Sequence, residues 1–360
     1  MMELTQDILT WVHGKFLRTQ VHALRMARDR WRTPLRVGII GCGTIAEVHA
    51  NVYRAIGGLK LTACVDIDSE RAEAFRVRHG IDAAYRDYRD LFGSDRPDIV
   101  SICTWPSTHA EIATEAAAAG VRGILVEKPL SVDLSEADAM VESAAKFGAV
   151  LIVGHHLRFD PLVEQARRVI ESGQLGPPRF VHVYCQGALL NTGTHAVDAV
   201  LLVLGDPTAE SIFAQVVMTG ECRERGLPAE DACVAQLRLA GGVTALFETG
   251  NVAREKFCIH VVGGEGQMTL RLDRLDVLRR GTKGWQTEVA PIVSPHERQA
   301  EALVRATRDG ERMPQSNARS ARHTQEILIG ILASAAARRP LSLPLEDRNS
   351  RYAELLERLR

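Results

Sequence analysis

Two side chains in this sequence have chemistry suited to proton exchange near neutral pH, those of Lys128 and His195. Lys128 directly follows the segment 121–127, which predicts a buried strand and ends in Glu127. An ammonium group that is partly removed from water and close to positive charge has a lowered pKa. It can then donate a hydrogen bond to a substrate oxygen or accept its proton. Taken alone, Glu127-Lys128-Pro129 is a surface turn more often than a catalytic site.

His195 has Asn191 four residues before it and Asp198 three residues after it. On an α-helix these three side chains would share one face, and an imidazole between two polar groups suits proton transfer. The alternative is a core histidine whose hydrogen bond is satisfied by Asp198. We predict no metal site, because the cluster holds a single histidine, and the adjacent His155 and His156 would point apart at a strand end.

The segment 35–46 predicts a strand, a tight turn and the start of a helix, with the turn written G-x-G-x-x-A. Gly41 provides the backbone angles of the turn, Gly43 lets the backbone approach a pyrophosphate, and a small third residue lets the helix pack closely. Phosphates would bind at the start of the helix, where Thr44 and Ile45 stand. We therefore predict a dinucleotide-binding unit. The alternative is a glycine turn in some other βαβ unit.

The acidic residue that completes this pattern is Asp66, which ends a predicted second strand at 59–65, about 20 residues beyond the glycine motif. Its carboxylate would accept hydrogen bonds from the adenine ribose and repel the extra phosphate of NADP. We therefore predict NAD as the cofactor, while NADP stays possible because Arg71 could bind a 2′-phosphate. The nicotinamide end of the cofactor would supply the positive ring beside Lys128.

The order of predicted elements divides the chain into two domains. Strands and helices alternate over 35–153, which predicts a Rossmann domain with a doubly wound parallel sheet. Over 154–345, helices are followed by strand segments joined by short turns, which predicts an α+β domain with an open, mostly antiparallel sheet. Ligands of such α/β proteins bind beyond the carboxyl ends of the parallel strands, where Thr104 and Lys128 are predicted to stand.

The two ends of the chain lie outside this scheme. Residues 1–34 show apolar residues at helical spacing among basic ones, and we predict a helical extension that packs on its own protein or on a second subunit. Membrane attachment through this segment is the alternative. Residues 346–360 are predicted to form a charged tail.

The composition excludes several classes of protein. The chain has 360 residues, 46% hydrophobic and 25% charged, with a formal net charge of −1, so neither nucleic acid nor a membrane surface is an expected partner. No run of about 18 apolar residues indicates a membrane span, and no secretory signal is visible. The seven cysteines are scattered without a C-x-x-C pair, which is typical of thiols in a reducing cytoplasm.

The ordered set of motifs resembles the Gfo/Idh/MocA family of nicotinamide-dependent oxidoreductases. The motifs are the glycine turn, the acid after the second strand, T-W-P-S-T-H at 104–109, E-K-P at 127–129, G-H-H-L-R-F-D-P at 154–161 and N-T-G-T-H-A-V-D at 191–198. The resemblance implies a Rossmann domain followed by an open-sheet domain, whose outer face often makes a homodimer or homotetramer. It also implies that the small-molecule substrate is a sugar, a cyclitol or a related polyol.

Carried over residue by residue, the resemblance implies two catalytic groups. Lys128 would touch the reacting oxygen, with Pro129 after a cis peptide, and His195 would be the acid or base. The residues implied to contact substrate are Arg158, Asn191 and Asp198. The residues implied or predicted to bind the cofactor are Gly41, Gly43, Thr44, Ile45, Asp66, Thr104, Pro106, His109, Glu127 and Lys128.

The sequence departs from the family pattern at two points. Asn191 stands where many members have aspartate, and an amide cannot supply the charge that raises the pKa of His195. Only Cys185 and Gln186 separate the strand at 179–184 from Gly187, where many members have a longer loop. The reaction type therefore transfers better than the identity of the substrate.

These observations favour an NAD-dependent dehydrogenase or reductase that transfers hydride between the cofactor and a secondary alcohol or ketone of a polyol. One alternative is a cofactor-binding regulator of the same fold that has lost its chemistry. Another is a reductase of imines or other small molecules.

Overall fold

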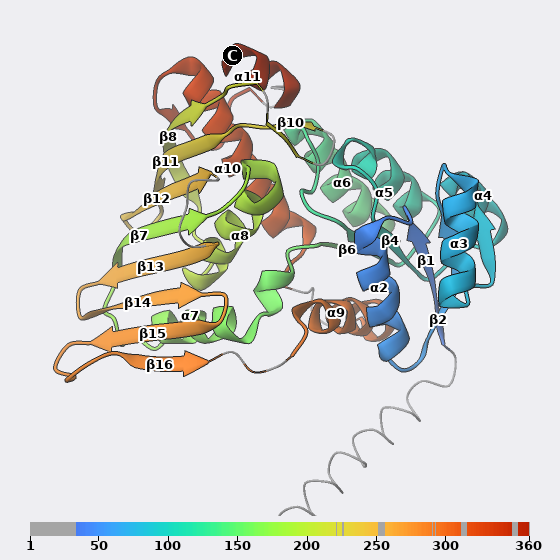
Figure 1. Ribbon diagram of the computed structural model, residues 1–360, viewed down its shortest axis with the longest axis horizontal. Helices are drawn as coiled ribbons and strands as arrows, with labels where there is room; N and C mark the ends of the chain where they lie inside the picture. The colour runs from blue at the N-terminus through green and yellow to red at the C-terminus, as the bar shows by residue number, and fades with distance from the viewer. Residues whose placement is uncertain are drawn as a thin grey trace, which may run out of the picture.

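The computed structural model describes residues 34–220, 222–224, 227–250, 256–289, 291, 293–310, 315–347 and 352–359. Two sheets lie side by side, a parallel one that carries the first half of the chain and a larger, mostly antiparallel one that carries the second (Figure 1). The helical extension predicted at 1–34 lies outside the described residues, apart from Pro34. Both predicted sheets are confirmed, and so is the α/β class.

The first sheet has six parallel strands in the order β3-β2-β1-β4-β5-β6. Its strands are β1 (Leu35–Ile40), β2 (Leu59–Val65), β3 (Ala83–Tyr85), β4 (Ile99–Ile102), β5 (Gly123–Val126) and β6 (Val150–Val153). The helices between them are α2 (Thr44–Ala55), α3 (Ser69–His79), α4 (Tyr88–Ser94), α5 (His109–Ala118) and α6 (Leu134–Phe147). The strand order changes direction between β1 and β4, which is where a Rossmann fold binds its ligand.

Two helices from late in the chain complete the core of this first domain. They are α9 (Pro295–Asp309) and α10 (Ala318–Ala337). In α9, the buried residues Ala300, Leu303 and Val304 pack with β1 and α2 residues, and in α10 Ala318 and Ala321 pack with residues of α5 and α6. The Rossmann domain is therefore covered in part by chain that follows the second sheet.

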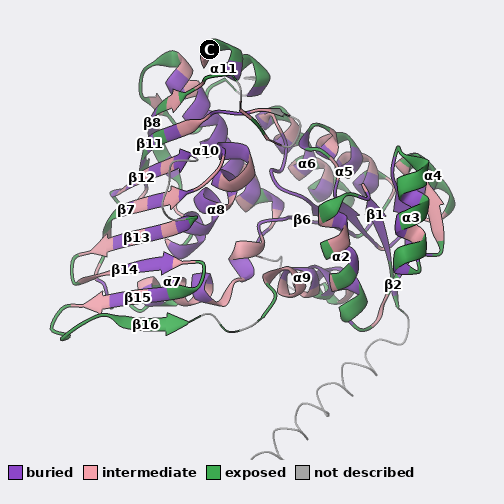
Figure 2. Ribbon diagram, viewed as in Figure 1, coloured by how far each residue is buried: buried purple, intermediate pink, exposed green. Residues whose placement is uncertain are grey.

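The second sheet has nine strands in the order β16-β15-β14-β13-β7-β12-β11-β8-β17. They are β7 (Pro178–Cys185), β8 (Ala209–Val217), β11 (Ala232–Leu239), β12 (Val243–Gly250), β13 (Phe257–Gly263), β14 (Gly266–Arg271), β15 (Arg274–Arg279), β16 (Gln286–Val289) and β17 (Leu341–Ser342). A separate short pair is formed by β9 (Arg223–Glu224) and β10 (Leu227–Pro228). The helices α7 (Pro161–Glu171), α8 (Thr194–Val203) and α10 bury its inner face (Figure 2).

The pair β7 and β12 is parallel, whereas the other pairs in this sheet are antiparallel. The chain leaves β7 through α8 and forms β8 and β11 before β12 returns beside β7. This crossover makes the sheet mixed. The hairpin between β11 and β12 turns at Gly241 and Gly242, both with positive φ (85° and 79°), a turn geometry that strongly favours glycine.

The charged segment at the C-terminus contains a packed helix, α11 (Tyr352–Leu359). Its buried residues Tyr352, Leu355 and Leu356 join the core of the second domain against α10. Apolar residues recur at helical spacing in this short segment, so its apolar side is buried while Glu354, Glu357 and Arg358 stay exposed.

Candidate active site

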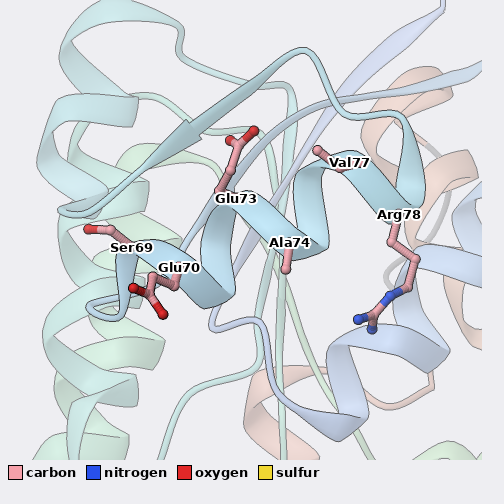
Figure 3. A pocket seen from close by; sticks show the side chains of 6 residues that line it. All are labelled: Ser69, Glu70, Glu73, Ala74, Val77 and Arg78. Atoms are coloured by element: carbon pink, nitrogen blue, oxygen red, sulfur yellow. The ribbon is translucent and has the colours of Figure 1, made fainter.

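A cleft of about 450 Å³ lies at the carboxyl ends of the first sheet, between its strands β1, β2, β4 and β5. Of the residues predicted for the cofactor, all but His109 line this cleft: Gly41, Gly43, Thr44, Ile45, Asp66, Thr104, Pro106, Glu127 and Lys128. A larger hollow of about 720 Å³ lies on the outer surface of α3 (Figure 3). Its six lining residues are all exposed and come from one helix, so no polar groups converge there as a binding site requires.

The two glycines of the turn do different work. Gly41 has a φ of +88°, and a Cβ there would lie 2.9 Å from the carbonyl of Cys103, so both strain and contact exclude a side chain. A Cβ on Gly43 would meet no atom within 4 Å, because this residue faces the open cleft at the start of α2. The first N–H groups of a helix have no partner within the helix. The space in front of Gly43 therefore fits a pyrophosphate.

A valine at position 43 tests this fit. We expect Gly43→Val to fold normally, since its backbone angles (φ −85°, ψ −167°) suit any residue, but to weaken NADH binding at least about tenfold through overlap with the phosphates. Thermal unfolding and titration of NADH fluorescence measure the two effects. The matched control is Gly57→Val, which also has open space at its Cβ but does not line the cleft. Equal NADH affinity in both variants would contradict the assignment.

Asp66 stands where β2 ends, at one end of the cleft, and is 7% exposed. Its Oδ2 accepts a hydrogen bond from the N–H of Cys42 (2.9 Å) and its Oδ1 from the N–H of Asp68 (3.0 Å), so the carboxylate is aimed before any ligand binds. Arg71 lies 3.5 Å from Asp66 Oδ1, and Arg86 lines the same end of the cleft. The carboxylate suits a ribose diol, and the two arginines are the groups that a 2′-phosphate would meet.

The loop after β4 carries Thr104 and Pro106 into the cleft. His109 was predicted to bind the cofactor, but it is fully buried, and its Nδ1 and Nε2 face the carbonyl oxygens of Pro129 (3.0 Å) and Thr104 (3.2 Å). Burial lowers the pKa of His109, so the ring is neutral and donates to one of the two carbonyls. His109 therefore joins the two loops that border the cleft instead of lining it.

Lys128 is 8% exposed and occupies the other end of the cleft from Asp66. Its Nζ donates to both oxygens of Asn191, the backbone O and Oδ1, each at 2.8 Å. The peptide between Lys128 and Pro129 is cis, as the resemblance implies. The amine that the Rossmann domain contributes is thus held by a residue of the second domain.

Asn191 does not share a helix face with His195 and Asp198, so this prediction was wrong. Residues Leu189–Gly193 form a π-helical turn, and α8 begins only at Thr194. Two carboxylates hold the start of the turn, because Glu224 Oε1 accepts from the N–H of Ala188 (3.1 Å) and Glu230 accepts from the N–H of Leu189. The wider turn directs Asn191 toward Lys128.

A buried polar chain supports the strand end that carries Lys128. Glu127 Oε1 lies 3.0 Å from His49 Nε2, His49 Nδ1 lies 3.1 Å from Ser101 Oγ, and that hydroxyl lies 2.7 Å from the OH of Tyr53. Burial opposes ionisation of Glu127, but His49 and Lys128 outweigh it and lower the pKa of Glu127 to about 2. A Cβ on Gly154 would lie 2.7 Å from Glu127 Oε1, so this glycine leaves room for the carboxylate.

His195 lies among other histidines at the start of α8. Its ring makes edge contacts with His155 and His156, at centroid distances of 5.9 and 4.7 Å, and His156 stacks on His296 at 4.0 Å. Burial, followed by the charges of His156 and Lys128, lowers the pKa of His195 well below 6.5. Its Nδ1 is buried and has no hydrogen-bond partner among the described residues. A neutral imidazole of this kind can accept a proton.

Arg158 and Asp198 are buried and do not line the cleft. Arg158 is 1% exposed, and it donates to Asp198 Oδ2 (2.8 Å), to both oxygens of Asp206 and to the backbone O of Gln315. Asp198 is fully buried and also accepts from the hydroxyl of Thr324 (3.1 Å). Their pairing ties η2 (His156–Phe159) to α8, and the contact of these two residues with substrate stays a prediction.

Several residues of the cleft were not predicted from the sequence. Ile67, Arg86, Tyr88, Trp105, Thr108, Glu111 and Ile112 line it. Trp105 is 58% exposed at the wall of the cleft, where its ring could stack on a ligand. Its position in T-W-P-S-T-H, at a strand end, was the available signal. Within the described ranges, no group of three His, Cys, Asp or Glu residues is arranged to hold a metal ion.

Comparison with known proteins identifies the class that this fold and cleft define, an oxidoreductase with an NAD-binding Rossmann fold, matched over residues 35–155. Residues 184–269 match the GFO/IDH/MocA C-terminal domain. The chain belongs to the Gfo/Idh/MocA family, and NAD is its cofactor. In the part of the chain that is described, no helix has the length and apolarity of a membrane span.

Two dehydrogenases are similar to this chain in sequence. D-apiose dehydrogenase of Paraburkholderia graminis is 28% identical over 270 residues, which cover 68% of this chain and 70% of that protein. Myo-inositol 2-dehydrogenase of Thermotoga maritima is 26% identical over 252 residues, covering 65% and 74%. The solved structure of levoglucosan dehydrogenase with NADH and levoglucosan superposes with a TM-score of 0.79 at 21% identity, covering 87% of this chain and all of that one.

Proposed function

We propose that this protein is an NAD-dependent dehydrogenase that oxidises a secondary alcohol of a sugar, cyclitol or similar polyol, or reduces the corresponding ketone. The observation that carries the proposal is the amine of Lys128, nearly buried at the end of the NAD cleft and oriented by Asn191. The names of the similar dehydrogenases support a polyol substrate. Bound NAD would accept hydride from the substrate carbon.

Two residues of the protein would bind the substrate oxygen and remove its proton. The Nζ of Lys128 donates to two oxygens of Asn191, which hold the ammonium at the end of the cleft, where it would donate a hydrogen bond to the substrate oxygen. This contact would stabilise the negative charge that develops as the hydroxyl proton leaves. His195, kept neutral by burial and neighbouring charge, would accept that proton. Asn191 and the cleft walls would orient the reacting carbon.

A panel of sugars, cyclitols and their keto forms tests the proposal. We expect NADH or NADPH absorbance to change with at least one polyol and to favour NAD over NADP, because the carboxylate of Asp66 in the cleft would accept hydrogen bonds from the ribose and repel a 2′-phosphate. A protein that binds NADH tightly but turns over no compound of the panel would instead be a cofactor-binding regulator. Activity confined to imines would indicate the other alternative.

The pH dependence of oxidation should reflect the lowered pKa of His195. We expect kcat/KM to keep its full value as pH falls to 6.5 and to decline only below it, because the imidazole accepts the substrate proton only while it is unprotonated. Profiles of kcat/KM against pH for wild type and His195→Gln measure this, and the acidic decline should disappear in the variant. A decline centred above pH 6.5 would contradict this role of His195.

Assembly through the second sheet belongs to the same proposal. Phe180, Phe213 and Val234 point outward from this sheet and are 39%, 40% and 47% exposed. Apolar side chains gathered on one face favour burial against another copy. We expect a homodimer or homotetramer by light scattering, reduced in size by Phe213→Glu. A wild-type monomer would contradict it.

The cytoplasm is the compartment that we propose. None of the seven cysteines forms a disulfide, and five of them are buried. Reducing compartments keep thiols in this state, whereas oxidising ones favour disulfides. Fractionation of cells that express the protein tests the assignment.

A further inference from the structure

A second, much smaller hollow adjoins the cleft beside Lys128. Pro106 lines both the cleft and the hollow, and Asn191, which holds the amine of Lys128, lines the hollow as well. The volume of the hollow is about 20 Å³. Since a water molecule needs roughly 10–15 Å³ of such space, the hollow has room for one hydroxyl or hydroxymethyl group.

One wall of the hollow is Tyr352, the first residue of α11. Its N–H donates to Asp133 Oδ1 (3.0 Å), its hydroxyl donates to the backbone O of Pro228 (2.9 Å), and the residue is 3% exposed. Figure 1 shows α11 beside α10 and β10, near the end of the chain. One hydrogen bond thus fixes the backbone of Tyr352 and another fixes the end of its side chain. The ring cannot move out of the wall without breaking at least one of them.

The charged residue of the hollow is Glu224, on β9. Its Oε1 accepts the N–H of Ala188, while its Oε2 is buried and has no hydrogen-bond partner among the described residues. A buried carboxylate oxygen without a donor is unfavourable, and a substrate hydroxyl could supply one. The same negative charge would repel a phosphate or a carboxylate.

We propose that this hollow is a subsite for one small, uncharged substituent next to the reacting carbon of the substrate. Tyr352 limits its size, and Glu224 receives its hydroxyl and rejects anions. The inference deepens the proposed function and rests on it: the substrates are unphosphorylated polyols whose substituent at this position is no larger than hydroxymethyl. Uronic acids and sugar phosphates with the charge at this position are excluded.

The test compares a polyol that the wild type oxidises with its monomethyl ethers and its phosphate esters. The measured quantity is the ratio of kcat/KM for the derivative to kcat/KM for the parent polyol. We expect Tyr352→Ala to raise this ratio about tenfold for one ether, and Glu224→Gln to raise it about tenfold for one phosphate ester. Tyr352→Phe keeps the wall and should leave the ratios unchanged. Leu355→Ala is the second control, because it removes buried contacts of α11 without touching the hollow.

Unchanged ratios in Tyr352→Ala and Glu224→Gln, or the same change in Leu355→Ala, would overturn the subsite. A wild type that oxidises no polyol would overturn the proposed function. In that case the wall that Tyr352 forms is tested by the rate at which trinitrobenzenesulfonate labels Lys128 in NADH-loaded protein. Faster labelling in Tyr352→Ala than in wild type and Leu355→Ala supports the wall. Equal labelling rates in these three proteins overturn it.

Discussion

Replacing Lys128 with alanine is expected to lower kcat for polyol oxidation by about 10²–10³-fold, the usual contribution of one donor that stabilises developing negative charge. The amine is nearly buried, and Asn191 aims it with two hydrogen bonds of 2.8 Å, so water or a neighbouring side chain cannot replace it. The affinity for NADH should stay close to that of wild type, because the glycine turn and Asp66 lie at the other end of the cleft. Steady-state kinetics and NADH titration measure both quantities.

The matched control for this prediction is Lys146→Ala. Lys146 is an exposed lysine on α6 whose amine lies over the ring of Phe147, away from the cleft. We expect kinetics like those of wild type from this variant. Lys128→Arg should be nearly as inactive as Lys128→Ala, because the larger, planar guanidinium cannot take the position of the amine between Asn191 and the substrate oxygen. Undiminished turnover in Lys128→Ala would refute the role of this amine.

The second large effect concerns stability. Arg158→Met is expected to lower the free energy of unfolding by about 3–5 kcal/mol, because it removes the guanidinium that neutralises the fully buried Asp198. The burial of Arg158 by itself opposes its charge, but Asp198 and Asp206 outweigh this and raise the pKa of the guanidinium. Denaturant unfolding measures the loss.

Arg168→Met provides the control, since Arg168 is an exposed arginine on α7 that bonds only to Gln165 in the described structure, and its loss should cost less than about 0.5 kcal/mol. The family resemblance gives Arg158 a different role, contact with substrate hydroxyls. The two roles are separable. If Arg158→Met has wild-type stability and a raised KM, Arg158 contacts substrate and its structural role is refuted.

Elements that depend on neighbours in the sequence could be predicted well. The glycine turn, Asp66 and Lys128 each follow a strand, and a parallel sheet brings all its strand ends to one edge, so chain order alone assembles the cofactor cleft. Elements that depend on distant packing were missed. The parallel pairing of β7 with β12 was not expected, because strand pairing across a crossover leaves no local signal.

The substrate side of the site shows the same division. Spacing predicted one helix face for Asn191, His195 and Asp198, but the π-helical turn directs Asn191 to Lys128, and Arg158 withdraws Asp198 into the core. A regular-helix assumption cannot anticipate one wider turn, whose N–H groups are held by carboxylates more than 30 residues away. The helical period therefore predicted that His195 lies on a helix, but it did not predict which side chains surround it.

The sequence by itself determined the class of this protein, because strand ends and helix starts of a Rossmann domain are set by contacts between nearby residues. Only the tertiary structure decided which side chains are free to meet a substrate. Buried hydrogen bonds hold Arg158, Asp198 and His109 outside the lining of the cleft. Tyr352, on the last helix of the chain, lines the hollow beside the cleft. Burial and partner geometry depend on how distant segments pack, and no local pattern of residue types encodes that packing.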